Sequence, residues 1–186
     1  NTFNQPGVQC EACHGKGKHH AESPSSDNIE TDDSALACGQ CHYRDEARVR
    51  IIAGGGFINH HEQYEEMKDG GHANLKCVDC HDYHKGVRRG QTGGIVKECT
   101  ACHSDVTTSH LGGDDCVACH MGHATKSARA VNKYVGDVRT HMFKIHDGAE
   151  DQATMFETVG DKTYVKQGYG VTLDFACYSC HQDEQG

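Results

Sequence analysis

Every cysteine in this sequence belongs to one five-residue motif, Cys-x-x-Cys-His, which occurs six times in 186 residues. Two thiols three positions apart reach the two vinyl groups of one porphyrin, and the adjacent histidine then lies under the iron. The spacing therefore predicts six covalently attached c-type haems. Their thioether cysteines are Cys10, Cys13, Cys38, Cys41, Cys77, Cys80, Cys99, Cys102, Cys116, Cys119, Cys177 and Cys180, and their proximal iron ligands are His14, His42, His81, His103, His120 and His181.

Other uses of paired cysteines explain the pattern less well. Twelve cysteines can hold three zinc ions in Cys₄ sites, or they can form a disulfide scaffold. Neither use needs a histidine after every second cysteine, although only 16 of the 186 residues are histidine. A thioredoxin-type motif occurs singly within a βαβ pattern, which this sequence lacks. Haem attachment is the interpretation that uses every cysteine and the histidine beside it.

The composition points to a core that side chains alone do not supply. Hydrophobic residues make up 35% of the chain, a figure that includes the twelve cysteines, and tryptophan is absent. Six motifs in 186 residues leave 186/6 = 31 residues for each, too few to wrap six porphyrins separately. We therefore expect the porphyrin faces to form most of the core, packed against Leu75, Ile95, Phe143 and Phe175.

The predicted fold is mostly irregular and α-helical with little β-structure. We expect one hexahaem domain over 1–186, with short helices and loops around a continuous stack of haems. Helices are predicted over 45–52 and 60–68, the second ending at Gly70 and Gly71. Polar and apolar residues alternate over 154–165 around Gly160-Asp161, which predicts one β-hairpin.

Ten further histidines are available as second axial ligands for the six irons. The candidates are His20, His60, His61, His72, His84, His110 and His141, with His123 and His146 as spares. The choices between His19 and His20, and between His60 and His61, stay open, because neighbouring helical residues diverge by about 100° and both members of a pair cannot face one iron. The alternative ligand is methionine, at Met67, Met121, Met142 or Met155.

Charge and hydropathy exclude several classes of partner. The formal net charge of −9 argues against nucleic acid and anionic membrane surfaces as partners. No stretch approaches the roughly 18 consecutive apolar residues of a membrane span. Because c-type haem is attached after export, we interpret Asn1 as a processed start and expect an extracellular or cell-surface protein, with the periplasm as the alternative.

Several runs of residues resemble the multihaem c-type cytochromes. They are Gly7 to Gly15 with His20 following, Phe57 to Glu65, His72 to His84, Cys119 to Ala128, Gly136 to His141 and Asp174 to Cys177. The first run departs from the usual Cys-His-Gly-Pro-Gly-x-x-His pattern, because Lys16 replaces the proline. The resemblance extends to outer-surface cytochromes that polymerise into extracellular nanowires. It implies haems with two histidine ligands in a stack that is alternately parallel and T-shaped.

These observations together predict an electron-transfer protein. We expect a subunit of an extracellular filament whose partners are further copies of itself, end to end, and other redox proteins or extracellular electron acceptors. The head-to-tail contact is expected to include a histidine donated by the His60/His61 pair to a haem of the next copy. A discrete periplasmic electron shuttle is the alternative. No enzymatic activity is expected, because all six motifs end in histidine and further ligands are plentiful.

Overall fold

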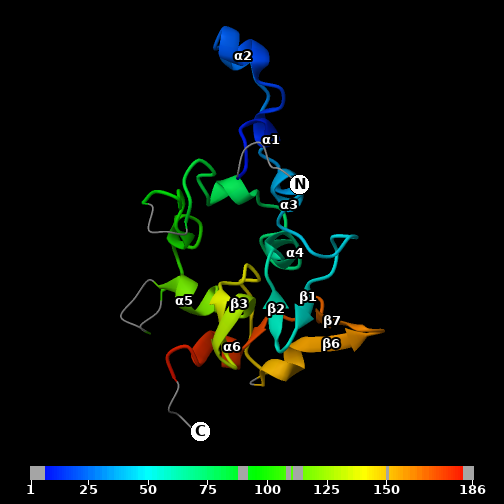
Figure 1. The fold of residues 1–186 in the computed structure, drawn as a ribbon. Helices are drawn as coiled ribbons and strands as arrows, with labels where there is room; N and C mark the ends of the chain where they lie inside the picture. The colour runs from blue at the N-terminus through cyan, green and yellow to red at the C-terminus, as the bar shows by residue number, and fades with distance from the viewer. Residues whose placement is uncertain (1–6, 88–91, 108–109, 111–114, 150, 182–186) are drawn as a thin grey trace.

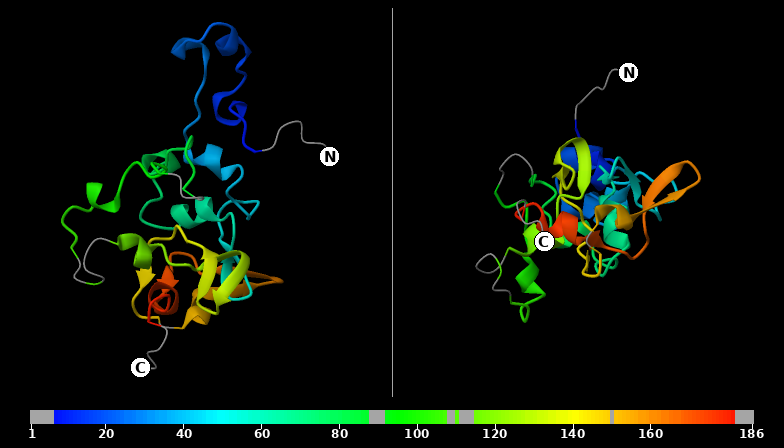
Figure 2. Two further views of the ribbon diagram at one scale, coloured as in Figure 1. Left: turned by 60° about the vertical axis from the view of Figure 1, so that its left-hand side comes forward. Right: turned by 90° about the horizontal axis from the view of Figure 1, so that it is seen from below.

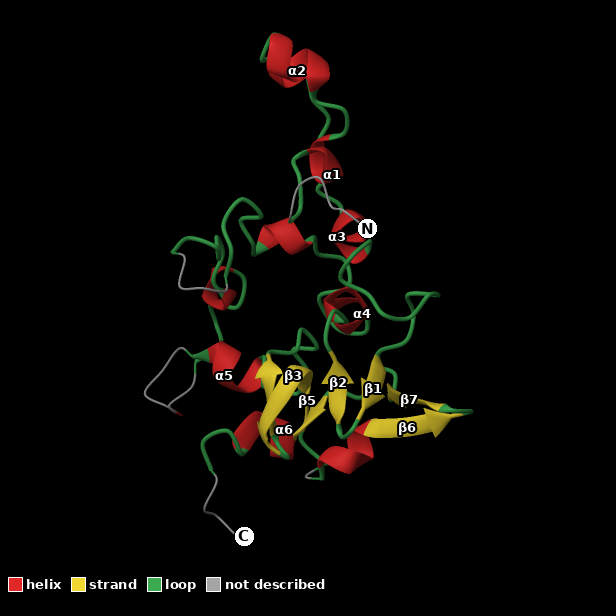
Figure 3. Cartoon of the chain, viewed as in Figure 1, coloured by secondary structure: helices red, strands yellow, loops and turns green. Residues whose placement is uncertain are grey.

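The computed structural model describes residues 7–87, 92–107, 110, 115–149 and 151–181. Its helices are short: α1 Glu11–His14, α2 Lys18–Glu22, α3 Ala35–Gly39, α4 Gln63–Lys68, α5 Cys116–His120 and α6 Leu173–Cys177, with 3₁₀ turns η1 Ser26–Asn28, η2 Cys77–Asp79, η3 Cys99–Ala101 and η5 Gln152–Met155. Its strands are β1 Ile52–Gly54, β2 Phe57–Asn59, β3 Thr125–Asn132, β4 Val135–Val138, β5 Ile145–His146, β6 Phe156–Val159, β7 Lys162–Val165 and β8 Val171–Thr172. These elements fall into two regions, a β-rich body and a set of motif-bearing turns and loops (Figure 3).

The body contains a six-stranded mixed sheet in the order β4-β3-β2-β1-β7-β6. Its strands pair antiparallel except β2 and β3, which run parallel with Ile58 opposite Thr125. A second, two-stranded parallel sheet joins β5 to β8. The expectation of a mostly irregular and helical fold with little β-structure is therefore wrong. The expected hairpin over 154–165 is present as β6 and β7, but it forms only the edge of the larger sheet.

The sheet escapes detection in the sequence for physical reasons. Strands β1 and β2 have three residues each, joined by a two-residue turn in which Gly55 and Gly56 adopt positive φ angles of 59° and 79°. Buried and exposed residues do not alternate regularly along β3. At this irregular part of the strand, the Asp137 carboxylate accepts hydrogen bonds from the backbone N–H groups of Ser127 and Ala128, at 2.6 and 3.1 Å. This interaction coincides with a register shift between β3 and β4.

The predicted helix over 45–52 is also wrong. The Asp45 carboxylate accepts hydrogen bonds from the N–H groups of Val49 and Arg50, at 3.2 and 3.1 Å, and so holds an irregular turn. Ile51 and Ala53 are then buried on one side of the chain as it enters β1. The predicted helix over 60–68 is shorter than expected, because α4 begins only at Gln63.

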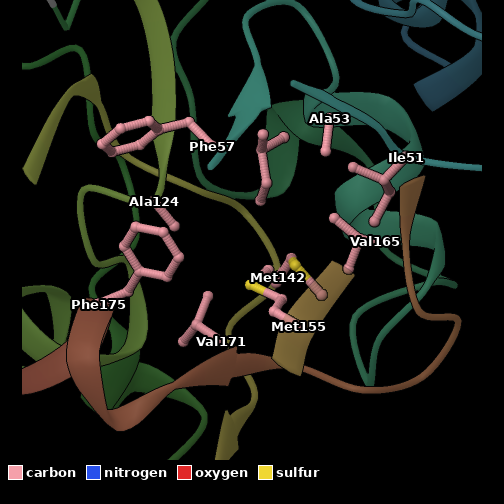
Figure 4. Packing of buried hydrophobic residues seen from close by; sticks show 10 residues of the cluster. Ile51, Ala53, Phe57, Ala124, Met142, Met155, Val165, Val171 and Phe175 are labelled. Atoms are coloured by element: carbon pink, nitrogen blue, oxygen red, sulfur yellow. The ribbon is translucent and has the colours of Figure 1, made fainter. Parts of the chain in front are cut away.

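A hydrophobic core made of side chains lies against the sheet (Figure 4). Ile58, Met155, Val171 and Phe175 have no exposed side-chain surface, and Phe57 and Phe175 pack with ring centroids 5.7 Å apart. Of the four residues expected to pack on porphyrin, Phe175 belongs to this side-chain core, whereas Leu75 and Ile95 are 40% and 43% exposed. The polypeptide therefore builds its own core in the β-rich body, beyond what its composition suggested.

The chain before α3 forms an arm. It contains α1, α2 and η1, and it projects from the rest of the molecule at the end opposite the sheet (Figures 1 and 2). Hydrogen bonds close the base of the arm, where Asp32 N donates to Cys13 O at 2.9 Å. The first motif therefore lies near the base of a projecting segment whose tip carries α2.

The close approach of β4 to β3 gives a test of the sheet. A Cβ atom on Gly136 would lie 2.1 Å from the carbonyl oxygen of Thr125, a contact that no side chain tolerates. Gly136→Ala should lower the free energy of unfolding by about 2 kcal/mol or more, because β4 has to move away from β3. The measurement is denaturant unfolding of the purified protein, followed by far-ultraviolet circular dichroism.

Gly17→Ala is the matched control, since Gly17 has nothing within 4 Å of its added Cβ and an ordinary negative φ. The control should differ from the wild type by less than about 0.5 kcal/mol. Equal stability of the two variants would contradict the pairing of β3 with β4.

Candidate functional site

Each motif folds as a single helical turn. The histidine N–H donates to the carbonyl oxygen of the first cysteine, at 2.9 Å in the first and fourth motifs and 3.0 Å in the second, third and sixth, and the fifth motif forms α5. This turn places both thiols and the imidazole of a motif around one locus, as attachment to a single porphyrin requires. All twelve cysteines are free of disulfide bonds.

Five of the six motif histidines face a second histidine from elsewhere in the chain. The distances between ring centroids are 6.2 Å for His14–His84, 5.8 Å for His42–His61, 6.1 Å for His81–His141, 6.0 Å for His103–His72 and 5.8 Å for His181–His110. Each pair joins one motif histidine to one histidine outside the motifs. The chain thus brings together residues as far apart in sequence as His110 and His181.

The spacing within these pairs fits two imidazoles on opposite sides of one metal ion. A metal–imidazole bond is about 2 Å long, so ring centroids across a shared iron lie about 6 Å apart. Packed phenylalanines reach a similar distance, as Phe57 and Phe175 do at 5.7 Å, so the assignment depends also on the fact that every pair combines a motif histidine with a histidine outside the motifs. The five pairs therefore have the geometry of axial ligand pairs, and the residues present fit a haem at each of these motifs.

Hydrogen bonds orient several motif rings for metal binding. The Nδ1 atoms of His14, His42 and His120 contact Glu30 O at 2.9 Å, Gln63 Oε1 at 3.1 Å and Phe143 O at 2.8 Å. A carbonyl oxygen only accepts hydrogen bonds, so Nδ1 carries the proton and Nε2 is the nitrogen left to bind a metal. No pattern in the sequence indicates these acceptors, because two of the three are backbone carbonyl oxygens, which every residue has.

Burial favours the neutral form of three of the facing histidines. Together with smaller contributions from the charges of His81 and His42, it lowers the pKa of His141 to about 4. Burial is also the main cause of the lowered pKa of His72 and of His61, with His103 and His60 contributing respectively. A neutral imidazole is the form that binds metal.

The thiols show that successive motifs are neighbours. Burial raises the pKa of the Cys38 thiol to about 11, and the nearby Cys77 thiol adds to the rise. Burial likewise raises the pKa of Cys99, with a contribution from Cys116, and that of Cys119, with a contribution from Cys180. Burial also raises the pKa of Cys80, and the Cys102 thiol contributes, which places the third motif beside the fourth. The second to sixth motifs therefore follow one another in space as they do in sequence, while His84 brings the first motif to the third.

His120 differs from the other motif histidines. All sixteen histidines lie within the described residues, and none of them makes a ring contact with His120 there. Two predicted ligands also face no motif histidine in this part of the chain. His20 contacts Ser25 O and Asn28 Oδ1 through Nδ1, both at 3.2 Å, and His60 contacts the Arg44 guanidinium.

The remaining histidines and methionines have other surroundings. His19 is 86% exposed near Glu22, His123 contacts Gly136 O at 3.1 Å through Nδ1, and His146 packs on Tyr169. Met142 and Met155, considered above as alternative ligands, lie in the side-chain core.

Three carboxylates are buried on α4 or at its N-cap, between the second and third motif sites. Glu62 and Glu66 have no exposed surface and Glu65 is 2% exposed. Burial raises the pKa of Glu62 to about 9 and that of Glu66 to about 7, the latter against hydrogen bonds that lower it. The sequence does not indicate this cluster, because the same three glutamates could equally lie on the exposed face of a helix.

A direct metal-binding cluster and a membrane-spanning helix are both absent from the described residues. These residues contain no group of three or more His, Cys, Asp or Glu side chains arranged to hold a metal ion directly; the histidines instead meet in the pairs given above. They also contain no helix with the length and apolar character to cross a membrane.

Comparison with known proteins places the fold. No protein-family model matches the chain, and no curated protein matches its sequence. Among solved structures, the octahaem sulfite reductase MccA of Wolinella succinogenes is similar, with a TM-score of 0.61, 20% sequence identity and 92% of this chain covered. The chain spans about a third of that protein, 34% of its length. The chain shares the fold of part of a multihaem enzyme, which contradicts the expectation that it has no enzymatic activity.

The His60/His61 pair gives a sharp test of the ligand geometry. His61→Ala should remove the imidazole opposite His42 and convert one haem per chain from low to high spin. His60→Ala removes the adjacent histidine, whose ring contacts Arg44, and should leave the spin state of every haem unchanged. Electron paramagnetic resonance of the oxidised protein measures both. A high-spin haem in His60→Ala but not in His61→Ala would contradict the pairing of His42 with His61.

Proposed function

We propose that the chain transfers electrons through six c-type haems held by its six motifs. The observation that carries this proposal is the set of five histidine pairs with ring centroids 5.8–6.2 Å apart. When bound, haem supplies reversible one-electron chemistry. The paired histidines occupy both axial positions at five motifs and so exclude substrate from those sites.

The protein's own residues set the order of these sites. The thiols of successive motifs are close neighbours from Cys38 to Cys180, so five sites adjoin in a row, and the His14–His84 pair brings the first beside the third. At three of the sites burial lowers the pKa of the facing histidine, His61, His72 or His141, so that the imidazole adds no positive charge. This arrangement suits transfer along the molecule from the arm to the C-terminal motif.

We further propose that the protein assembles head to tail into an extracellular filament. His120 lacks a facing histidine among the described residues, while His20 lies in the projecting arm with Nδ1 fixed by Ser25 and Asn28. The ring of His20 thus has the orientation of a ligand, and no motif histidine of its own chain faces it. In the proposed filament, His20 of one copy completes the axial position opposite His120 of the next.

This donor replaces the one expected from the sequence. His61 already faces His42, and His60 contacts Arg44. Neither histidine is therefore proposed as a ligand to a haem of another copy. The partners proposed here are further copies of the chain and, at the ends of a filament, other redox proteins or extracellular acceptors. If no filament forms, a periplasmic electron shuttle is the corresponding alternative.

A multihaem reductase is the second candidate function. Two observations favour it: the axial position opposite His120 is not filled by a histidine of the same chain, and the fold resembles part of a sulfite reductase. A haem there would bind a small reducible oxyanion of the sulfite type at that position. The other five sites would then supply it with electrons.

Electron microscopy and spin state together separate these functions. The wild type should form filaments in which all haems are low-spin. His20→Ala should give separate subunits with one high-spin haem each, because the ligand opposite His120 is lost. His19→Ala changes the exposed neighbouring histidine and should behave as the wild type.

The other outcomes decide against the filament. Monomeric wild type with six low-spin haems would support the shuttle. Monomeric wild type with one high-spin haem that binds sulfite, and that is unaffected by His20→Ala, would support the reductase.

A further inference from the structure

Glu66 is the most highly bonded of the buried carboxylates. It lies on α4 with no exposed surface and accepts hydrogen bonds from Thr125 Oγ1 at 3.3 Å and Thr140 Oγ1 at 2.9 Å. It also accepts a short hydrogen bond from the backbone N–H of His141. Both threonines are themselves fully buried. One carboxylate therefore satisfies three donors in a region without access to water.

These hydrogen bonds join three segments that are distant in sequence. Helix α4 follows closely after His61, Thr125 opens β3, and Thr140 precedes His141. Further bonds hold the same turn, since Thr140 N donates to Gly122 O at 3.0 Å and Met142 N donates to Thr140 Oγ1 at 3.2 Å. Of these partners, only Glu66 accepts a hydrogen bond from the backbone N–H of His141.

The position of the His141 ring depends on this backbone. Its centroid lies 6.1 Å from that of His81, and its buried Nδ1 makes no hydrogen bond of normal geometry among the described residues, with the Arg139 backbone as the only group that interacts with the ring in this way. The ring therefore lacks a short hydrogen bond like the one by which the Gln63 amide holds His42. Packing and the backbone to which Glu66 is bonded accordingly contribute most of its orientation.

We propose that Glu66 is a positioning residue that holds His141 opposite His81 and ties this pair to the helix following His61. The inference rests on the proposed haem ligation and assigns Glu66 a role in building the site at the third motif. Burial alone does not give a residue this role. Glu62, at the N-cap of the same helix, is equally buried, yet within the described residues its carboxylate accepts no hydrogen bond from His141, Thr125 or Thr140.

The test compares Glu66→Ala, Glu66→Gln and Glu62→Gln in the haem-loaded protein. Glu66→Ala removes the acceptor for His141 N–H, so His141 should be displaced and one additional haem per chain should become high-spin and bind carbon monoxide when reduced. Glu66→Gln keeps an acceptor oxygen, and its amide N–H can donate to a threonine hydroxyl, so low spin should be restored. Glu62→Gln should match the wild type.

Haem content, measured by the pyridine haemochrome assay, shows whether a negative result counts against the proposed function or only against the role of Glu66. Fewer than six haems in the wild type would defeat the proposed function itself. Six haems with a spin state unchanged in Glu66→Ala would overturn only the role of Glu66. If the Glu66→Ala protein does not accumulate, the Thr140→Val protein is measured in its place. Thr140→Val removes the hydroxyl that donates to Glu66 beside His141 and leaves α4 intact. Carbon monoxide binding above the wild-type level then supports the proposal, and binding at the wild-type level overturns it.

Discussion

The structure depends on pairs of imidazoles held about 6 Å apart, a separation that leaves room for one metal ion between them. Five times the chain sets a motif histidine, anchored in a helical turn, against a histidine from another segment, with ring centroids 5.8–6.2 Å apart. Packed phenylalanines reach a similar distance, at 5.7 Å for Phe57 and Phe175, so the distance alone does not set the histidine pairs apart. Each of the five pairs joins one motif histidine to one histidine outside the motifs, as two ligands of one iron would.

The β-rich body provides the fixed frame for part of this arrangement. Sheet pairing and a side-chain core around Phe175 and Ile58 hold β3, α4 and the turn before His141 in one unit. Glu66, which has no exposed surface, links these elements through hydrogen bonds to Thr125 and Thr140. In the projecting arm, by contrast, His14 and His20 are oriented by local hydrogen bonds to Glu30, Ser25 and Asn28. The molecule thus combines a packed β-rich end with a projecting arm.

The sequence reveals the chemistry of the site better than its architecture. Cys-x-x-Cys-His is a local pattern, so its residues and their helical turns can be predicted directly. The partners of the motif histidines cannot, because pairing His14 with His84 requires the tertiary fold. The sheet was missed because β1 and β2 are too short to show alternation and β3 does not alternate regularly. The role proposed for Glu66 has no local signal, since its hydrogen bonds to Thr125, Thr140 and His141 depend on the tertiary fold.

The central claim is that the twelve cysteines and the paired histidines enclose six covalently bound haems. The intact mass of the purified protein, recorded under denaturing conditions, tests it most directly, because thioether-linked haem stays with the chain while metal ions and loosely bound groups are lost. The account predicts one species whose mass equals that of the chain plus six haems, with no thiol left to react with an alkylating reagent. A chain without added haem mass, or one carrying fewer than six haems with free or disulfide-bonded cysteines, would contradict it.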